Sequence, residues 1–163
     1  ASGKTVEVDN TDAEGRLLLA DALHYATRFN PDIIVDFATL TGACVVALGH
    51  EAAGMMGNDD ALQKTLAKIG EKVGERVWSL PNYDEYASYL ASDWADIKNA
   101  GSRWGGAVTA GVFLKQFVPE KASWAHIDIA GVGYLDKVHN GLPKGATGFG
   151  VVLMTTFLQD LLK

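Results

Sequence analysis

The stretch DIIVDFA at residues 32–38, followed by TLTG at residues 39–42, decides the fold class. Its first part is a nearly continuous apolar run with β-branched residues, which is typical of a strand that is buried on both faces. Such strands lie in sheets that helices cover. We therefore expect an α/β protein, with the TLTG loop at the carboxyl end of a strand, where functional loops of such sheets gather.

Predicted strands and helices alternate on both sides of this stretch, as judged from apolar periodicity and helix-capping residues. The alternation predicts a mixed central sheet flanked by helices in three layers. A length of 163 residues suits a single domain. The further predicted strands are residues 4–9, 52–56, 77–80 and 124–129. The predicted helices are residues 17–29, 59–74, 104–117 and 149–162. Residues 82–101 and 131–148 are expected to be irregular.

The composition excludes some classes of partner. The formal net charge is −6, and lysines and arginines are scattered singly, so the charge pattern supports neither nucleic-acid binding nor a membrane surface. The most apolar stretch, residues 149–158, is too short to span a bilayer. The only cysteine, Cys44, lies in an apolar run, which predicts a buried thiol and agrees with a reducing cytoplasm.

The segment NTDAEGR at residues 10–16 has two interpretations. Thr11 and Glu14 match a capping box ahead of an apolar helix, a purely structural role. If the segment is instead still extended, Asp12, Glu14 and Arg16 face the same way. Two adjacent carboxylates repel each other unless a cation lies between them, which favours a pair of metal ions. Arg16, beside the free N–H groups of a helix start, then suits an anion.

Other catalytic patterns are incomplete. SGKT at residues 2–5 resembles the end of a phosphate-binding loop, but the required upstream glycine is missing and a strand follows. His50 and Glu51 begin a zinc-protease pattern that lacks its second histidine. His126 and Asp128 share one face of a predicted strand, which we interpret as a hydrogen-bonded structural histidine.

The stretch NTDAEGRLLLADAL, from residue 10, closely resembles the signature of the leucyl aminopeptidase family, the cytosol aminopeptidases with two metal ions. Further stretches resemble the same family in order, so the resemblance covers essentially the whole chain. It implies a mixed sheet between helices, a homo-hexamer and the removal of N-terminal residues from peptides. The further stretches are residues 36–44, 99–114, 124–133 and 144–151.

The resemblance also implies residue roles. Asp12 and Glu14 match ligands of two divalent metal ions, zinc or manganese, and Arg16 matches the arginine that holds a bicarbonate ion as general base. The positions that match the pocket for a leucine-like first side chain are Thr39, Leu40, Gly42 and Ala130.

One departure from the family pattern concerns the remaining site residues. In the family, the other metal ligands are a lysine and two aspartates, and a second lysine is catalytic. All four residues precede the NTDAEGR motif. In this sequence the only lysine before the motif is Lys4, and it does not match either family lysine. We therefore expect residues 1–163 to be the C-terminal portion of a dimetal aminopeptidase catalytic domain, metal-poor and inactive alone. The alternatives are a non-catalytic scaffold that keeps this fold for assembly and, less well supported, a nucleotide-binding enzyme.

Overall fold

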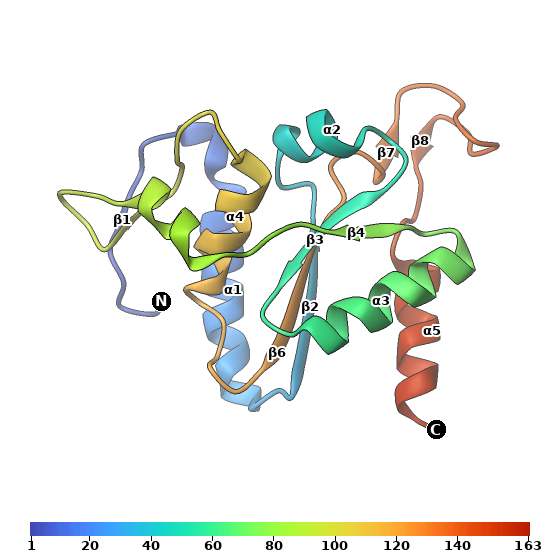
Figure 1. Cartoon of the computed structure of the whole chain (residues 1–163), viewed down its shortest axis with the longest axis horizontal. Coiled ribbons are helices and arrows are strands. Elements are labelled where there is room, and N and C mark those ends of the chain that lie inside the picture. The colour runs from blue at the N-terminus through green and yellow to red at the C-terminus, as the bar shows by residue number, and fades with distance from the viewer.

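A four-stranded mixed sheet forms the centre of the computed structural model, which describes all residues 1–163 (Figure 1). Its strand order is β2-β6-β3-β4. Strand β2 (Ile33–Ala38) runs parallel to β6 (Ser123–Asp128). Strand β3 (Ala53–Gly57) is antiparallel to β6 and parallel to β4 (Val77–Ser79). The predicted mixed sheet is confirmed.

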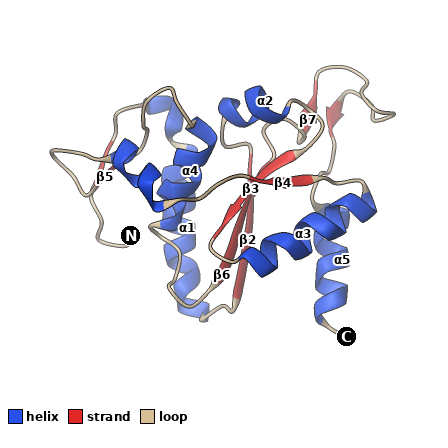
Figure 2. Cartoon of the chain, in the orientation of Figure 1, coloured by secondary structure: helices blue, strands red, loops and turns tan.

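Helices cover both faces of this sheet (Figure 2). Helices α1 (Gly15–Ala26) and α4 (Gly106–Lys115) lie on one side, and α3 (Asp60–Val73) and α5 (Val151–Leu161) lie on the other. Because successive side chains of a strand point to opposite faces, neighbouring residues of β6 belong to different cores. Trp124 packs among residues of α1 and α4, whereas Ile127 packs among residues of α3 and α5. The three-layer prediction is confirmed.

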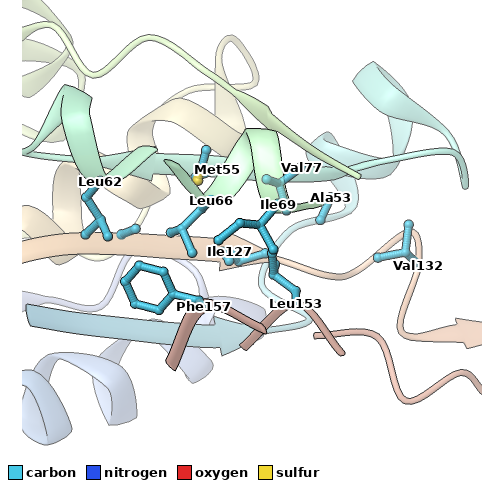
Figure 3. Close-up of a cluster of buried hydrophobic side chains, with 11 residues drawn as sticks. Ala53, Met55, Leu62, Leu66, Ile69, Val77, Ile127, Val132, Leu153 and Phe157 are labelled. Atoms are coloured by element: carbon cyan, nitrogen blue, oxygen red, sulfur yellow. The ribbon is translucent and has the colours of Figure 1, made fainter. Parts of the chain in front are cut away.

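The core between the sheet, α3 and α5 is fully apolar (Figure 3). Met55, Leu66, Ile127 and Leu153 have no exposed surface. Helix α3 begins after Asp59, whose Oδ1 accepts hydrogen bonds from the N–H groups of the first turn, and ends at a left-handed glycine, as its sequence predicts. The caps therefore fix the length of the helix that covers this core.

Two predictions about strands need correction. The predicted strand at residues 4–9 is reduced to β1 (Val6–Glu7), which pairs with β5 (Ile97–Lys98) outside the central sheet. Side chains of β2 pack against the cores on both faces of the sheet, Val35 and Phe37 on one face and Ile34 on the other. They are only half-buried, and Ile33 is exposed, because β2 is an edge strand that pairs only with β6.

The remaining elements are short. Helix α2 (Gly42–Leu48) follows the TLTG loop, and a two-stranded hairpin of β7 (Tyr134–Leu135) and β8 (Gly145–Ala146) lies within the glycine-rich segment after β6. None of the helices combines the length and the apolar character that crossing a bilayer requires. The 3-10 helices are η1 (Thr11–Ala13), η2 (Thr27–Phe29) and η3 (Asp84–Leu90).

Candidate functional site

The NTDAEGR segment is helical rather than extended. Asn10 is extended, and its side-chain oxygen accepts a hydrogen bond of 2.9 Å from the N–H of Asp12, which starts η1. Helix α1 then begins at Gly15, and Glu14 at its N-cap position makes no side-chain capping bond. Both the extended interpretation and the capping box of Thr11 and Glu14 are therefore wrong. Asparagine caps a helix as well as threonine does, and here Asn10, one residue before Thr11, is the capping residue, with the N–H of Asp12 as its donor.

The three charged side chains of this segment have different surroundings. Asp12 and Glu14 are exposed, and their carboxylates make no hydrogen bond or ion pair with the protein. Arg16 is only 8% exposed, and its Nη1 donates a 2.7 Å hydrogen bond to the carbonyl of Asn99. Its Nε is buried without a hydrogen-bond partner. Burial lowers the pKa of Arg16, and the negative charge of Asp128 opposes this shift.

A buried asparagine that the sequence did not reveal holds the start of the segment. Asn99 has no exposed surface. Its Oδ1 accepts hydrogen bonds from the N–H groups of Asp9 and Asn10 at 2.9 and 3.2 Å, and its Nδ2 donates to the carbonyl of Asn10 at 2.7 Å. The backbone carbonyl of Asn99 also accepts the hydrogen bond from Arg16. Asn99 therefore holds the backbone of residues 9 and 10 at a fixed position relative to the guanidinium of Arg16.

The loops that follow β2 and β6 meet at one edge of the sheet, as predicted. The two strands are parallel and in register from Ile33 to Ala38, so Ala38 lies opposite Asp128 and both chains leave the sheet there. Thr39 and Gly42 are exposed, whereas Leu40 is half-buried. A Cβ atom placed on Gly42 would meet no atom within 4 Å, so the space in front of this loop is open.

The carboxylate of Asp128 joins these two loops. Its Oδ1 accepts hydrogen bonds from the N–H groups of Leu40 at 3.0 Å and Ala130 at 3.1 Å. Its Oδ2 accepts from the hydroxyl of Thr41 at 2.7 Å, and that hydroxyl caps α2 by accepting from the N–H of Cys44. Asp128 has no exposed surface, so these donors replace the water that a carboxylate otherwise requires.

Helix α1 begins next to the TLTG loop. A Cβ atom placed on Gly15 would lie 4.0 Å from Cδ1 of Leu40. The start of α1, which carries Glu14 and Arg16, and the loop that carries Thr39 therefore lie together, although they are far apart in the sequence. The chain nevertheless forms no group of three or more His, Cys, Asp and Glu side chains arranged to hold a metal ion.

His126 and Cys44 have structural roles. His126 is fully buried, and its Nδ1 lies 2.5 Å from Oδ1 of Asp36, whose other oxygen accepts a 2.7 Å bond from the indole of Trp124. The prediction of a hydrogen-bonded structural histidine is confirmed. Cys44 is a buried free thiol, as predicted, and burial together with the charge of Asp128 raises its pKa to about 11. The thiol is therefore protonated, and unreactive as a nucleophile, near neutral pH.

Comparisons with known proteins cover nearly the whole chain. The sequence model described as the cytosol aminopeptidase family, catalytic domain, matches residues 1–155. A protein named probable cytosol aminopeptidase from Geobacter sp. (strain M21) is 58% identical over 158 residues, which is 97% of this chain and 32% of that protein. Another of the same name, from Xanthomonas oryzae pv. oryzae (strain MAFF 311018), is 57% identical over 159 residues, 98% of this chain and 31% of that protein.

The fold agrees with these sequence comparisons. The solved structure of a tomato leucine aminopeptidase mutant superposes with a TM-score of 0.91 at 45% identity, over 97% of this chain and 30% of that one. The chain thus spans about a third of the length of the curated relatives that it matches. With a family match over 155 residues and identities above one half, the chain belongs to the cytosol aminopeptidase family, whose catalytic domain contains the matched segment.

Proposed function

We propose that the full-length protein is a metal-dependent aminopeptidase that releases N-terminal amino acids, preferably leucine-like ones, from peptides. The observation that carries the proposal is the pair of exposed carboxylates, Asp12 and Glu14, which have no partner in the protein and precede the buried Arg16 at the start of α1. A capping role does not account for them, because Asn10 caps η1. Membership of the cytosol aminopeptidase family supports the peptidase activity.

The two carboxylates fit part of a metal site. Carboxylate oxygens bind zinc and other divalent cations, and Asp12 and Glu14 are free to do so. Two divalent ions, zinc or manganese, would polarise the peptide carbonyl and supply an activated water when bound. Asp12 and Glu14 supply only part of such a site, and we propose that the remaining ligands come from outside residues 1–163. We therefore propose that residues 1–163 are the C-terminal portion of the catalytic domain and that this portion alone is metal-poor and inactive.

Arg16 fits the role of an anion holder. Its guanidinium is buried and is anchored at Nη1 by the carbonyl of Asn99, while Nε has a free donor. A planar guanidinium presents paired donors to a planar oxyanion, which suits bicarbonate. In the proposed mechanism, Arg16 would hold bicarbonate, which would supply a general base for the reaction.

The two loops at the carboxyl ends of β2 and β6 fit the pocket for the first side chain of the peptide. Thr39, Leu40 and Gly42 come from the loop after β2, and Ala130 comes from the loop after β6. These residues are small or apolar, and the space in front of Gly42 is open. An apolar pocket of this kind favours leucine-like side chains.

The proposal extends to assembly and location. The names of the relatives, cytosol aminopeptidases, support a cytoplasmic protein, and the family resemblance supports a homo-hexamer. Peptides are the proposed substrates, and neither nucleic acid nor a membrane is a proposed partner, in agreement with the net charge of −6.

The activity is tested with the full-length protein and leucine-p-nitroanilide. We expect cleavage in the presence of manganese or zinc, loss of cleavage after treatment with a chelator, and recovery when metal is returned. The reason is that both the water and the carbonyl depend on the metal ions for activation. Absence of cleavage with either metal, in a folded preparation, would favour the non-catalytic scaffold instead.

A further inference from the structure

We propose that Asp128 is a positioning residue that sets the spacing between the two walls of the pocket for the first side chain. This inference rests on the function proposed above, because it concerns that pocket. Asp128 touches no substrate in this account. It acts through Leu40 and Ala130, which its carboxylate holds together.

The carboxylate of Asp128 joins the two loops at a single atom. The N–H groups of Leu40 and Ala130 come from loops on different strands, yet both donate to the same atom, Oδ1 of Asp128. A shared acceptor fixes the distance between the two donors more tightly than separate acceptors do. Hydrogen bonds to a carboxylate are also shorter and stronger than those to a neutral oxygen. The spacing of the two walls therefore depends on one buried atom.

The sheet itself does not require the carboxylate of Asp128. The backbone of β6 is already paired with β2 and with β3 at Asp128. The N–H of Ile129 also donates a 2.8 Å bond to the carbonyl of Ala38, which extends the pairing of β2 and β6 past Asp128. All three donors to the side chain of Asp128 lie beyond the ends of β2 and β6. The carboxylate thus organises the loops rather than the strands.

Asp36 provides a matched control on the same face of the sheet. It is also a mostly buried carboxylate, with 14% of its side chain exposed, and it accepts hydrogen bonds from two side chains, those of His126 and Trp124. None of its partners belongs to the pocket loops. Replacing Asp36 by alanine therefore removes a comparable buried acceptor without releasing Leu40 or Ala130.

The test compares kcat/KM for leucine-p-nitroanilide and alanine-p-nitroanilide in the full-length protein with manganese. Asp128→Ala is expected to lower the leucine-to-alanine ratio of kcat/KM by about tenfold. When the two walls of the pocket move apart, a bulky substrate side chain loses more contacts with them than a small one does. Asp128→Asn, which keeps an oxygen acceptor but holds the two N–H groups less strongly, is expected to lower the ratio by less than Asp128→Ala does. Asp36→Ala is expected to lower the thermal stability and leave the ratio unchanged. A ratio in Asp128→Ala equal to that of the unmodified protein would overturn the role of Asp128.

A second measurement does not depend on activity. In Asp128→Asn, hydrogen exchange at the amides of Leu40 and Ala130 is expected to be about tenfold faster than in the unmodified protein, because a neutral acceptor holds them less strongly. Exchange at Ile129, which bonds to a backbone carbonyl, is expected to stay the same. Unchanged exchange at Leu40 and Ala130 would overturn the proposal even if Asp128→Ala does not fold. Failure of the unmodified protein to cleave either substrate would instead overturn the function proposed above.

Discussion

Replacing Glu14 by alanine in the full-length protein is expected to lower the turnover of leucine-p-nitroanilide by more than about a hundredfold. Loss of a residue that only supports a metal ligand already costs about 10- to 100-fold, and the loss of a ligand exceeds that. The fold is expected to be unaffected, because the Glu14 side chain is exposed and makes no hydrogen bond. Exposed substitutions of this kind change the free energy of unfolding by about 0.5 kcal/mol or less, so Tm should stay within about 2 °C.

Glu120→Ala is the matched control for this prediction. Glu120 is also exposed, but it lies before β6, at the opposite end of the sheet from the candidate site. Its replacement is expected to leave both turnover and Tm unchanged. If Glu14→Ala retains turnover, Glu14 is no metal ligand. If Glu14→Ala unfolds, the side chain has a structural role that its lack of contacts does not explain.

Replacing Arg16 by alanine is expected to lower kcat by about 10²- to 10⁴-fold, the usual contribution of a positioned general base. The proposed bicarbonate site needs the guanidinium, so added bicarbonate is expected to raise the rate of the unmodified protein and not that of the variant. This variant also loses the hydrogen bond to the carbonyl of Asn99, which leaves a buried acceptor unpaired at a cost of about 1–3 kcal/mol. Initial rates across a bicarbonate titration, together with a thermal melt, measure the two effects separately.

Arg28→Ala is the control for Arg16→Ala. Arg28 is an exposed arginine just beyond the other end of α1, where its guanidinium lies over the ring of Tyr25. Its loss is expected to preserve kcat and the response to bicarbonate. A normal bicarbonate response in Arg16→Ala would show that the anion is held elsewhere.

The central sheet and its covering helices were predictable because their apolar residues repeat with a clear period. Strand β2 is covered on both faces, as its apolar run predicts, but its residues are only half-buried because it lies at the edge of the sheet. Sequence alone gives the apolar character of a strand but not its number of neighbours. The prediction for residues 4–9 is wrong for a related reason: alternation indicates an extended segment, and not the sheet to which it belongs.

The sequence singles out the candidate site residues but not the contacts that they make. The motif at residues 10–16 singles out Asp12, Glu14 and Arg16, yet its local conformation depends on Asn10 and on the distant Asn99. Asn99 lies in a segment without periodicity, so no pattern marks it. Asp128 lies at a strand end that sequence does identify, but its bonds to two separate loops require the register of β2 and β6.

The central claim, that Asp12 and Glu14 bind metal ions, is tested most directly by the metal content of the full-length protein. The protein is loaded with zinc and separated from free metal by gel filtration. Its zinc content is then measured by inductively coupled plasma mass spectrometry. We expect about two zinc ions per chain in the unmodified protein, as in two-metal peptidase sites, and less than one in the double variant Asp12→Ala and Glu14→Ala. Equal zinc content in the two proteins, both folded, would contradict the account.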